Sequence, residues 1–446
     1  MTLFKMRVSR TQWAVGHGFF HSGTITAEGK PVTYVYDCGA TTKNQRNLKR
    51  EIDEFVSRLY VGPKYQRYLY SRSRNVDIMY ISHFDYDHIS GIPYLAKQTS
   101  VSRFVIPMTP VSSRIFCLAG SLFPSVYYSS SNNSSTYDAN VGDFDEWYWD
   151  FIANPVTALR EITGPDVEIQ QMTPLDEEEI RVDETVSEDY ILTNSEIRNS
   201  AIRSYSDLNI SQPQNRLNLW NITNLSGAPV WEFKTHVLWD AQNQAAVFVQ
   251  KLKQLALIND EKDLEDVNIV RNLVLNHTSD LKKAFKDAVA MIGSSFTLNI
   301  TSLMLYSGTV LGQKLRTFRS KAAFYDRPEI GAWPTVPGWI GYGDASLGAK
   351  KRLHEAIDAF AEYRSRTYVI APPHHGSPRE WGSELLEGYG LHGNDAPTCV
   401  FGADGSYGHP AQRVLLDVNA SGGTAIVVTS DCRSRWTDSL TVYVDA

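Results

Sequence analysis

The 446-residue sequence is short of cysteine and of long apolar runs. Its four cysteines stand singly without a CxxC pair, which argues against a zinc ribbon and offers no disulfide framework. No stretch reaches the roughly 20 uninterrupted apolar residues of a membrane span. Residues 1–11 contain basic residues but no apolar run of signal-peptide length. We therefore expect a protein of the reducing cytoplasm with no membrane partner.

The sequence also lacks an excess of positive charge. It has 43 Lys and Arg residues against 50 Asp and Glu residues, a net charge of -7, which is the wrong sign for a protein that coats nucleic acid with its whole surface. Any recognition of phosphate must be local. A hydrophobic content of 42% excludes global disorder. The length fits one large decorated domain or a catalytic core with an inserted module.

Strand and helix patterns alternate at both ends of the sequence and predict a layered α/β core. β-branched and aromatic runs at 32–36, 76–82 and 102–107 flank a helical face over 44–60. Six more strand-like runs, at 297–306, 339–341, 368–371, 398–401, 424–429 and 440–444, lie in the last third. We expect residues 1–108 and 277–446 to be the two halves of the core.

The middle region, residues 109–276, breaks this rhythm. It contains a polar low-complexity stretch at 129–136, an acidic and aromatic stretch at 143–150 and an acidic run at 173–189. Such a region can be a solvated loop or lid, or a surface that binds a protein partner, and the sequence leaves both readings open.

The strongest chemical signal is the sequence HFDYDH at His83–His88, which follows a predicted strand and precedes a predicted helix. In an extended turn His83, Asp85 and Asp87 lie on one side, and entry into the helix turns His88 toward the same centre. Imidazole and carboxylate ligands suit zinc, manganese or other first-row divalent ions. The alternative is a polar helix cap.

Three later strand ends supply further candidates. Asp344 follows a glycine after a short apolar strand and is placed to bridge two cations, although Gly-Asp is also an ordinary turn pair. His374 and His375 are adjacent, so in an extended segment they point to opposite sides and only one is expected to be a ligand. His409 precedes a predicted helix and is either a cap or a catalytic group.

Together these motifs resemble the metallo-β-lactamase superfamily and, within it, the hydrolase domain of ComEC-type DNA-uptake channel proteins. The resemblance covers residues 12–107 and 296–446 and implies an αββα sandwich with a large insertion. It rests on seven elements: Val15–Gly18 (VGQG with His for Gln), Tyr36–Gly39 with its strand-end Asp37, His83–His88 (HxDxDH, with Asp85 for the second His), Asn299 with Ser302, Asp344, His374–Ser377 (HHGS) and Tyr407–Pro410 (YGHP).

The resemblance implies two divalent metal ions, zinc or manganese, as cofactors. One ion would be held by His83 and Asp85. The other would be held by Asp87, His88 and His375, with Asp344 between the two. Three residues, Asp37, Asn299 and Ser302, would stand behind these ligands. Asp87 would also act in catalysis, and His374 and His409 would face the substrate as a phosphate contact or a proton donor.

The resemblance favours a metal-dependent hydrolase, a phosphodiesterase or nuclease that uses a water activated by two metal ions. A hydrolase of a thioester, lactone or amide bond in the same fold is one alternative. A non-catalytic subunit of a multi-protein system, such as a bacterial defence module, is another. Candidate guides for a phosphodiester are Lys350–Arg352 and Arg379, although a basic helix start is usually solvated.

Overall fold

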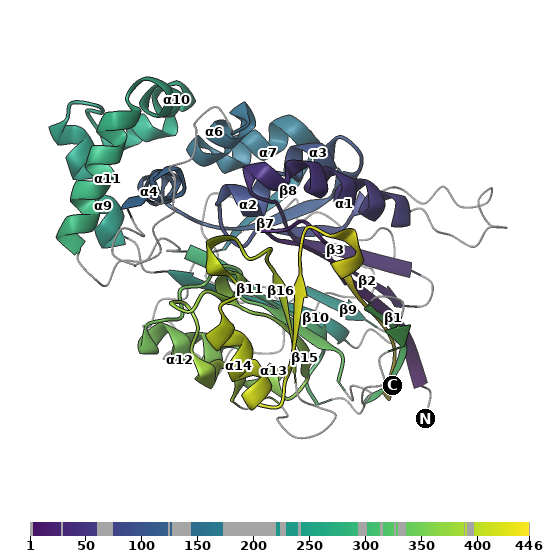
Figure 1. Cartoon of the computed structure of the whole chain (residues 1–446). Coiled ribbons are helices and arrows are strands. Elements are labelled where there is room, and N and C mark those ends of the chain that lie inside the picture. The colour runs from purple at the N-terminus through teal and green to yellow at the C-terminus, as the bar shows by residue number, and fades with distance from the viewer. Residues whose placement is uncertain are drawn as a thin grey trace, which may run out of the picture.

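A computed structural model of the chain contains two mixed β-sheets with helices on their outer sides (Figure 1). The structure describes residues 3–27, 30–59, 75–123, 125–126, 144–172, 220–223, 229–239, 242–292, 301–312, 315–324, 327–328, 336–387, 389 and 397–445. Both termini of the described chain lie on the same side of the molecule, where β1 and β18 are neighbours.

The first sheet has nine described strands. Their order is β13 (Arg327–Pro328), β12 (Leu315–Phe324), β18 (Trp436–Asp445), β1 (Leu3–Gln12), β2 (Phe20–Ala27), β3 (Lys30–Cys38), β5 (Ile78–Tyr80), β7 (Arg103–Pro107) and β8 (Glu168–Met172). Neighbours are antiparallel from β13 to β3 and parallel from β3 to β8.

The second sheet has seven described strands and, like the first, an antiparallel part and a parallel part. Their order is β17 (Thr424–Val428), β16 (Thr398–Gly402), β15 (Thr367–Ala371), β14 (Gly338–Gly341), β11 (Thr301–Thr309), β10 (Pro229–Trp239) and β9 (Trp220–Thr223). Neighbours are parallel from β17 to β14 and antiparallel from β14 to β9. A two-stranded ladder joins β4 (Asn75–Val76) and β6 (Ser100–Val101).

Side-chain alternation along the strands builds three hydrophobic clusters. On β3, Tyr34 and Tyr36 face a cluster shared by the two sheets, whereas Val35 faces the opposite side. The Tyr36 hydroxyl donates to the carbonyl of Leu303 on β11 (2.7 Å), so a hydrogen bond also joins the sheets. Each sheet has a further cluster on its outer face, under the helices.

Helices cover the outer face of each sheet (Figure 1). Those beside the first sheet include α1 (Gln45–Arg58), α3 (Ile92–Ala96), α4 (Val111–Leu122), α6 (Glu146–Ala153) and α7 (Pro155–Thr163). Those beside the second are α12 (Lys350–Ala359), α13 (Ala361–Arg364) and α14 (Gln412–Ala420). No helix in the described part of the chain is long and apolar enough to cross a membrane.

The region 109–276 contributes to both sheets. Its strand β8 extends the first sheet, and β9 and β10 extend the second. Its helices α9 (Gln242–Gln254) and α10 (Val267–Asn276) pack with α11 (Thr278–Ile292), which lies beyond residue 277. The acidic run at 173–189 and the polar stretch at 129–136 lie outside the described residues. The domain boundaries at 108 and 276 stay a prediction.

Two predicted elements differ from the observed ones. The strand predicted over 76–82 is divided at Asp77, whose Oδ2 accepts a hydrogen bond from the Thr33 N–H (2.6 Å), and only β5 joins the first sheet. In the last third of the chain, the periodicity of apolar residues over 353–363 predicts a single helix, which the structure divides at Phe360, where the backbone leaves the helical conformation (φ -120°, ψ 16°).

A buried ion pair joins β1 to β18 and supplies a test of the fold. Arg10 Nη2 lies 2.8 Å from Asp438 Oδ2, both side chains are fully buried, and Arg10 Nη1 donates to the carbonyl of Pro337 (2.8 Å). We expect Asp438→Ala to lower the free energy of unfolding by about 3–5 kcal/mol, because it leaves a buried guanidinium without its carboxylate. Urea unfolding followed by tryptophan fluorescence measures this. The double variant Arg10→Met, Asp438→Leu is the control and should lose less, and a single variant within about 1 kcal/mol of the wild type would contradict the argument.

Candidate metal centre

The candidate site lies at the carboxyl ends of parallel strands from both sheets. In the first sheet, Asp37 is the penultimate residue of β3, and the loop after β5 leads into His83–His88. In the second sheet, Asp344 follows β14, His374 and His375 follow β15, and His409 follows β16. Polar loops at the carboxyl ends of parallel strands meet along one edge, which is where α/β proteins commonly bind ligands.

The HFDYDH loop is shaped by the short helix α2 (Tyr86–Ile89). Asp85 precedes this helix in an extended conformation, but its side chain makes no capping hydrogen bond. Asp85 therefore does not cap this helix through its side chain. Asp87 and His88 lie in this short helix. Because Cα–Cβ bonds in a helix tilt toward its N-terminus, both side chains lean back toward the loop after β5.

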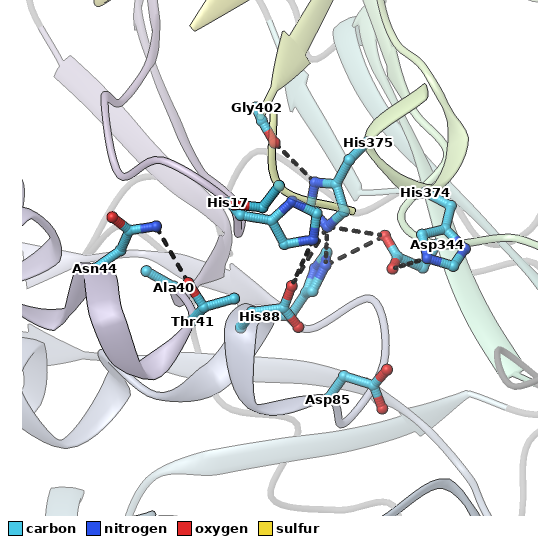
Figure 2. A network of polar contacts seen from close by, with 12 residues as sticks. His17, Ala40, Thr41, Asn44, Asp85, His88, Asp344, His374, His375 and Gly402 are labelled. Carbon is cyan, nitrogen blue, oxygen red and sulfur yellow. Dashed lines mark hydrogen bonds and ion pairs between the residues drawn. The ribbon is translucent and has the colours of Figure 1, made fainter. Parts of the chain in front are cut away.

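Six side chains converge in two groups of three. One group is His83, His88 and Asp344, and the other is His17, Asp87 and His375; within each group one ligand atom per residue lies within 4.8 Å of the others. Figure 2 shows the rings of His17, His88 and His375 and the Asp344 carboxylate directed toward one another.

The distances are those expected around cations. In the first group, Asp344 Oδ1 lies 3.2 Å from His88 Nε2, and Asp344 Oδ2 lies 3.7 Å from His83 Nε2. In the second, Asp87 Oδ2 lies 3.5 Å from His375 Nε2 and 3.8 Å from His17 Nε2. The groups adjoin, since His88 Nε2 and His375 Nε2 are 3.2 Å apart.

Hydrogen bonds leave the Nε2 atoms of three histidines free to bind a metal. The Nδ1 of His88 donates to Asp37 Oδ2 (2.8 Å), and the Nδ1 of His375 donates to the carbonyl of Gly402 (2.8 Å). The Ser82 hydroxyl donates to Asp37 (2.6 Å) and thus accepts from His83 Nδ1 (2.8 Å). His83 Nε2 is buried without a hydrogen-bond partner. Such outer contacts typically orient metal-binding histidines, so this donor set fits divalent ions.

The buried carboxylates and imidazoles of the two groups favour a positive charge between them. Burial is the largest influence on the pKa of Asp344 and raises it, but the neighbouring histidines, His88 and His375 foremost, outweigh burial and hold the pKa well below its usual value. Burial likewise lowers the pKa of His88, but the carboxylates of Asp344 and Asp37 raise it well above its usual value. The field of the carboxylates therefore stabilises positive charge at the imidazole Nε2 atoms.

The sequence comparison agrees with this geometry. Residues 25–165 match the family model of the metallo-beta-lactamase superfamily. The matched stretch contains Asp37 and His83–His88 and ends before Asp344. No curated protein matches the sequence. Proteins with a metallo-β-lactamase domain are usually metal-dependent hydrolases, so the match supports hydrolase chemistry for this chain. The resemblance to ComEC-type hydrolase domains stays a prediction.

The metal groups differ from the division that the sequence resemblance implied. That division placed His83 with Asp85, and His88 with Asp87 and His375. In the structure the bond from His88 Nδ1 to Asp37 turns its Nε2 toward Asp344 and the first group, but the same Nε2 lies 3.2 Å from His375 Nε2, so His88 contacts both groups and the implied division stays a prediction. Asp85 lies 3.6 Å from His83 Nε2 but belongs to neither group, and Figure 2 shows it apart from the network.

The residues expected behind the ligands have different positions. Asp37 is fully buried and, besides His88 and the Ser82 hydroxyl, accepts a hydrogen bond from the Ser82 N–H (2.7 Å). Ser302 is buried and donates to the carbonyl of Tyr342 (3.2 Å), two residues before Asp344. Asn299 lies outside the described residues. Of the candidate guides, Arg352 donates to the carbonyl of Ser346 (3.4 Å), close in sequence to Asp344.

Histidines that belong to neither group line the remaining side of the site. His374 Nε2 lies 3.7 Å from Asp344 Oδ2. The His409 ring lies 5.5 Å from the His374 ring and 6.0 Å from the His17 ring, and both of its ring nitrogens are buried without a hydrogen-bond partner. The half-exposed Tyr407 ring lies 4.8 Å from the His17 ring.

Backbone strain is concentrated at this site. Asp37, His374, His375 and Tyr407 all have positive φ values, between 47° and 56°. Only one other described residue that is not glycine, Ala256, shares this conformation. Side chains larger than glycine adopt it at a cost that the surrounding structure must offset, and such residues often cluster where function requires a fixed geometry.

The sequence analysis did not assign His17 to the site. The sequence contains a feature that could have indicated its role, because His17 stands between two glycines in Val15–Gly18. Burial and the neighbouring His375 lower the pKa of His17 to about 3, so its imidazole is neutral and one ring nitrogen has a free lone pair.

Metal binding should depend on Asp37. We expect Asp37→Asn to weaken divalent-metal binding about 10- to 100-fold, because an amide has one acceptor oxygen for the three bonds that the carboxylate accepts. Equilibrium dialysis against zinc or manganese measures the affinity. Asp77→Asn is the matched control, since Asp77 is a buried aspartate immediately before β5 and outside both groups. Equal affinities for Asp37→Asn and wild type would refute the role of Asp37.

Proposed function

We propose that this chain is a metal-dependent phosphodiesterase or nuclease. The observation that carries the proposal is the contact between the two ligand groups, which share the Asp344 neighbourhood and adjoin through His88 and His375. Two cations held side by side suit displacement at phosphorus, where both the attacking and the leaving oxygen need stabilisation.

In this proposal some of the site residues would hold the cations and others would contact the substrate. Two divalent ions, when bound, would neutralise phosphate oxygens and lower the pKa of a water toward neutrality. His83, His88 and Asp344 would hold one ion, and Asp87 and His375 the other. Asp37 and Ser82 keep the imidazole rings of His83 and His88 oriented through their Nδ1 atoms.

The substrate side is formed by imidazoles. His409 is buried with both ring nitrogens unpartnered, so a phosphate oxygen beside it would satisfy one of them. His374, which lies at the edge of the first group, would contact the same substrate. The net charge of -7 favours a short strand or small nucleotide over long duplex nucleic acid, whose affinity grows with the number of phosphates neutralised.

We also propose that the two sheets form the αββα sandwich of this superfamily. The shared cluster between the sheets and the helices outside both support that architecture. Because β8, β9 and β10 pair with the sheets, the inserted part would be the helical group of α4, α9, α10 and α11. This group is the proposed lid or protein-binding module.

The function can be tested with paired synthetic substrates. With manganese or zinc we expect faster turnover of bis-p-nitrophenyl phosphate than of p-nitrophenyl acetate, loss of activity with EDTA and recovery with added metal. Asp344→Asn should lower kcat/KM at least about 100-fold, since it removes a charge shared by the ligands.

Plasmid, single-stranded DNA, RNA and cyclic dinucleotides then define the natural class. Faster turnover of the ester would favour the thioester, lactone or amide alternative. A lack of turnover of every substrate, with metal shown to be bound, would favour a non-catalytic subunit. Either result rejects the phosphodiesterase proposal.

The role of His409 can be tested separately. We expect His409→Gln to lower kcat/KM about 10- to 100-fold, the effect of losing one hydrogen bond to a charged group. A substrate contact predicts a similar loss for a nitrophenolate and for an alkoxide leaving group, so bis-p-nitrophenyl phosphate and a dinucleotide are compared. A loss confined to the dinucleotide would show instead that His409 donates a proton to the leaving group.

A further inference from the structure

The loop between β1 and β2 has a fixed conformation. Gly16 and Gly18 have φ values of 86° and 140°, which side chains larger than glycine rarely adopt. A Cβ at Gly16 would lie 2.6 Å from the side chain of Asn44, and one at Gly18 would lie 2.5 Å from Cα of Ala40. The carbonyl of His17, between them, accepts a hydrogen bond from the Thr41 N–H (3.0 Å).

This loop directs the His17 imidazole into the metal centre. The side chain is only 6% exposed, and its Nε2 lies 3.8 Å from Asp87 Oδ2. Its ring lies 4.4 Å from the His375 ring, and Figure 2 shows the two rings side by side. A metal with bonds of roughly 2.0–2.2 Å separates its ligand atoms by about 3.0–3.6 Å, so a shift of a few tenths of an ångström brings His17 into range.

We propose that His17 is a ligand of the second cation, together with Asp87 and His375. The inference rests on the proposed metal-dependent function and adds a ligand from a loop that precedes the HFDYDH motif. Each group then supplies two imidazoles and one carboxylate: His83, His88 and Asp344 in one, His17, His375 and Asp87 in the other.

This ligand set bears on the choice of metal. Asp85 belongs to neither group, although its Oδ2 lies 3.6 Å from His83 Nε2. Two nitrogen ligands and one oxygen ligand per ion favour zinc or another first-row transition metal over magnesium, which prefers oxygen ligands. Three protein ligands also leave a position open for water or substrate.

The test is a metal titration rather than an assay. Wild-type protein stripped with chelator and titrated with zinc should bind two equivalents, measured by dialysis and elemental analysis. His17→Gln should keep one equivalent at the wild-type affinity and bind the other at least about tenfold more weakly. Titration with cobalt(II) should show a matching loss of one of two sets of visible absorption bands.

His409→Gln is the matched control, because His409 is a buried histidine of the same site in neither group, and it should keep both equivalents. Circular dichroism and the metal-free melting temperature check folding, and His17→Asn replaces the glutamine variant if that does not fold. Two equivalents of unchanged affinity in the variant would overturn the inference and leave the proposed function standing. A wild-type protein that binds no metal would overturn both.

Discussion

The buried carboxylate of Asp37 is the interaction on which the site depends. It lies at the end of β3 with no exposed surface, and it accepts hydrogen bonds from the Ser82 backbone, the Ser82 hydroxyl and His88 Nδ1. Burying a charged carboxylate is costly unless such bonds satisfy it. These bonds join β3 to the start of the HFDYDH loop, and through Asp37 and Ser82 they orient the rings of His88 and His83.

The second constraint is the pairing of the two sheets. Each sheet changes from antiparallel to parallel pairing, and the parallel strands of both sheets send their carboxyl-terminal loops to one edge. The shared cluster and the bond from Tyr36 to the carbonyl of Leu303 hold the sheets in register. The loops that follow β5, β14 and β15 can therefore meet, although β5 belongs to one sheet and β14 and β15 to the other.

Much of this site could be predicted from sequence because its residues follow strand ends. The HFDYDH motif is local, and the periodicity of the flanking segments places it between a strand and a helix. The grouping of the ligands could not be predicted, since it depends on how the Nδ1 bond to Asp37 turns His88. His17 was missed because one histidine in a glycine turn has no local partner. The strands β8, β9 and β10 were missed because acidic and polar stretches interrupt their region.

Charge balance links this site to the stability of the chain. Asp37 and Asp344 are buried and Asp87 is largely buried, and the ion pairs that these carboxylates form in the site are with imidazoles rather than with Lys or Arg. Without metal, the carboxylates are compensated when His88 and His375 take up protons, and the pKa of both histidines is raised accordingly. A divalent ion at the Nε2 atoms would compete with those protons for the same lone pairs, so its binding would release them. The carboxylates that are costly to bury without a compensating charge are the groups that would bind a cation, so the free energies of folding and of metal binding would be coupled.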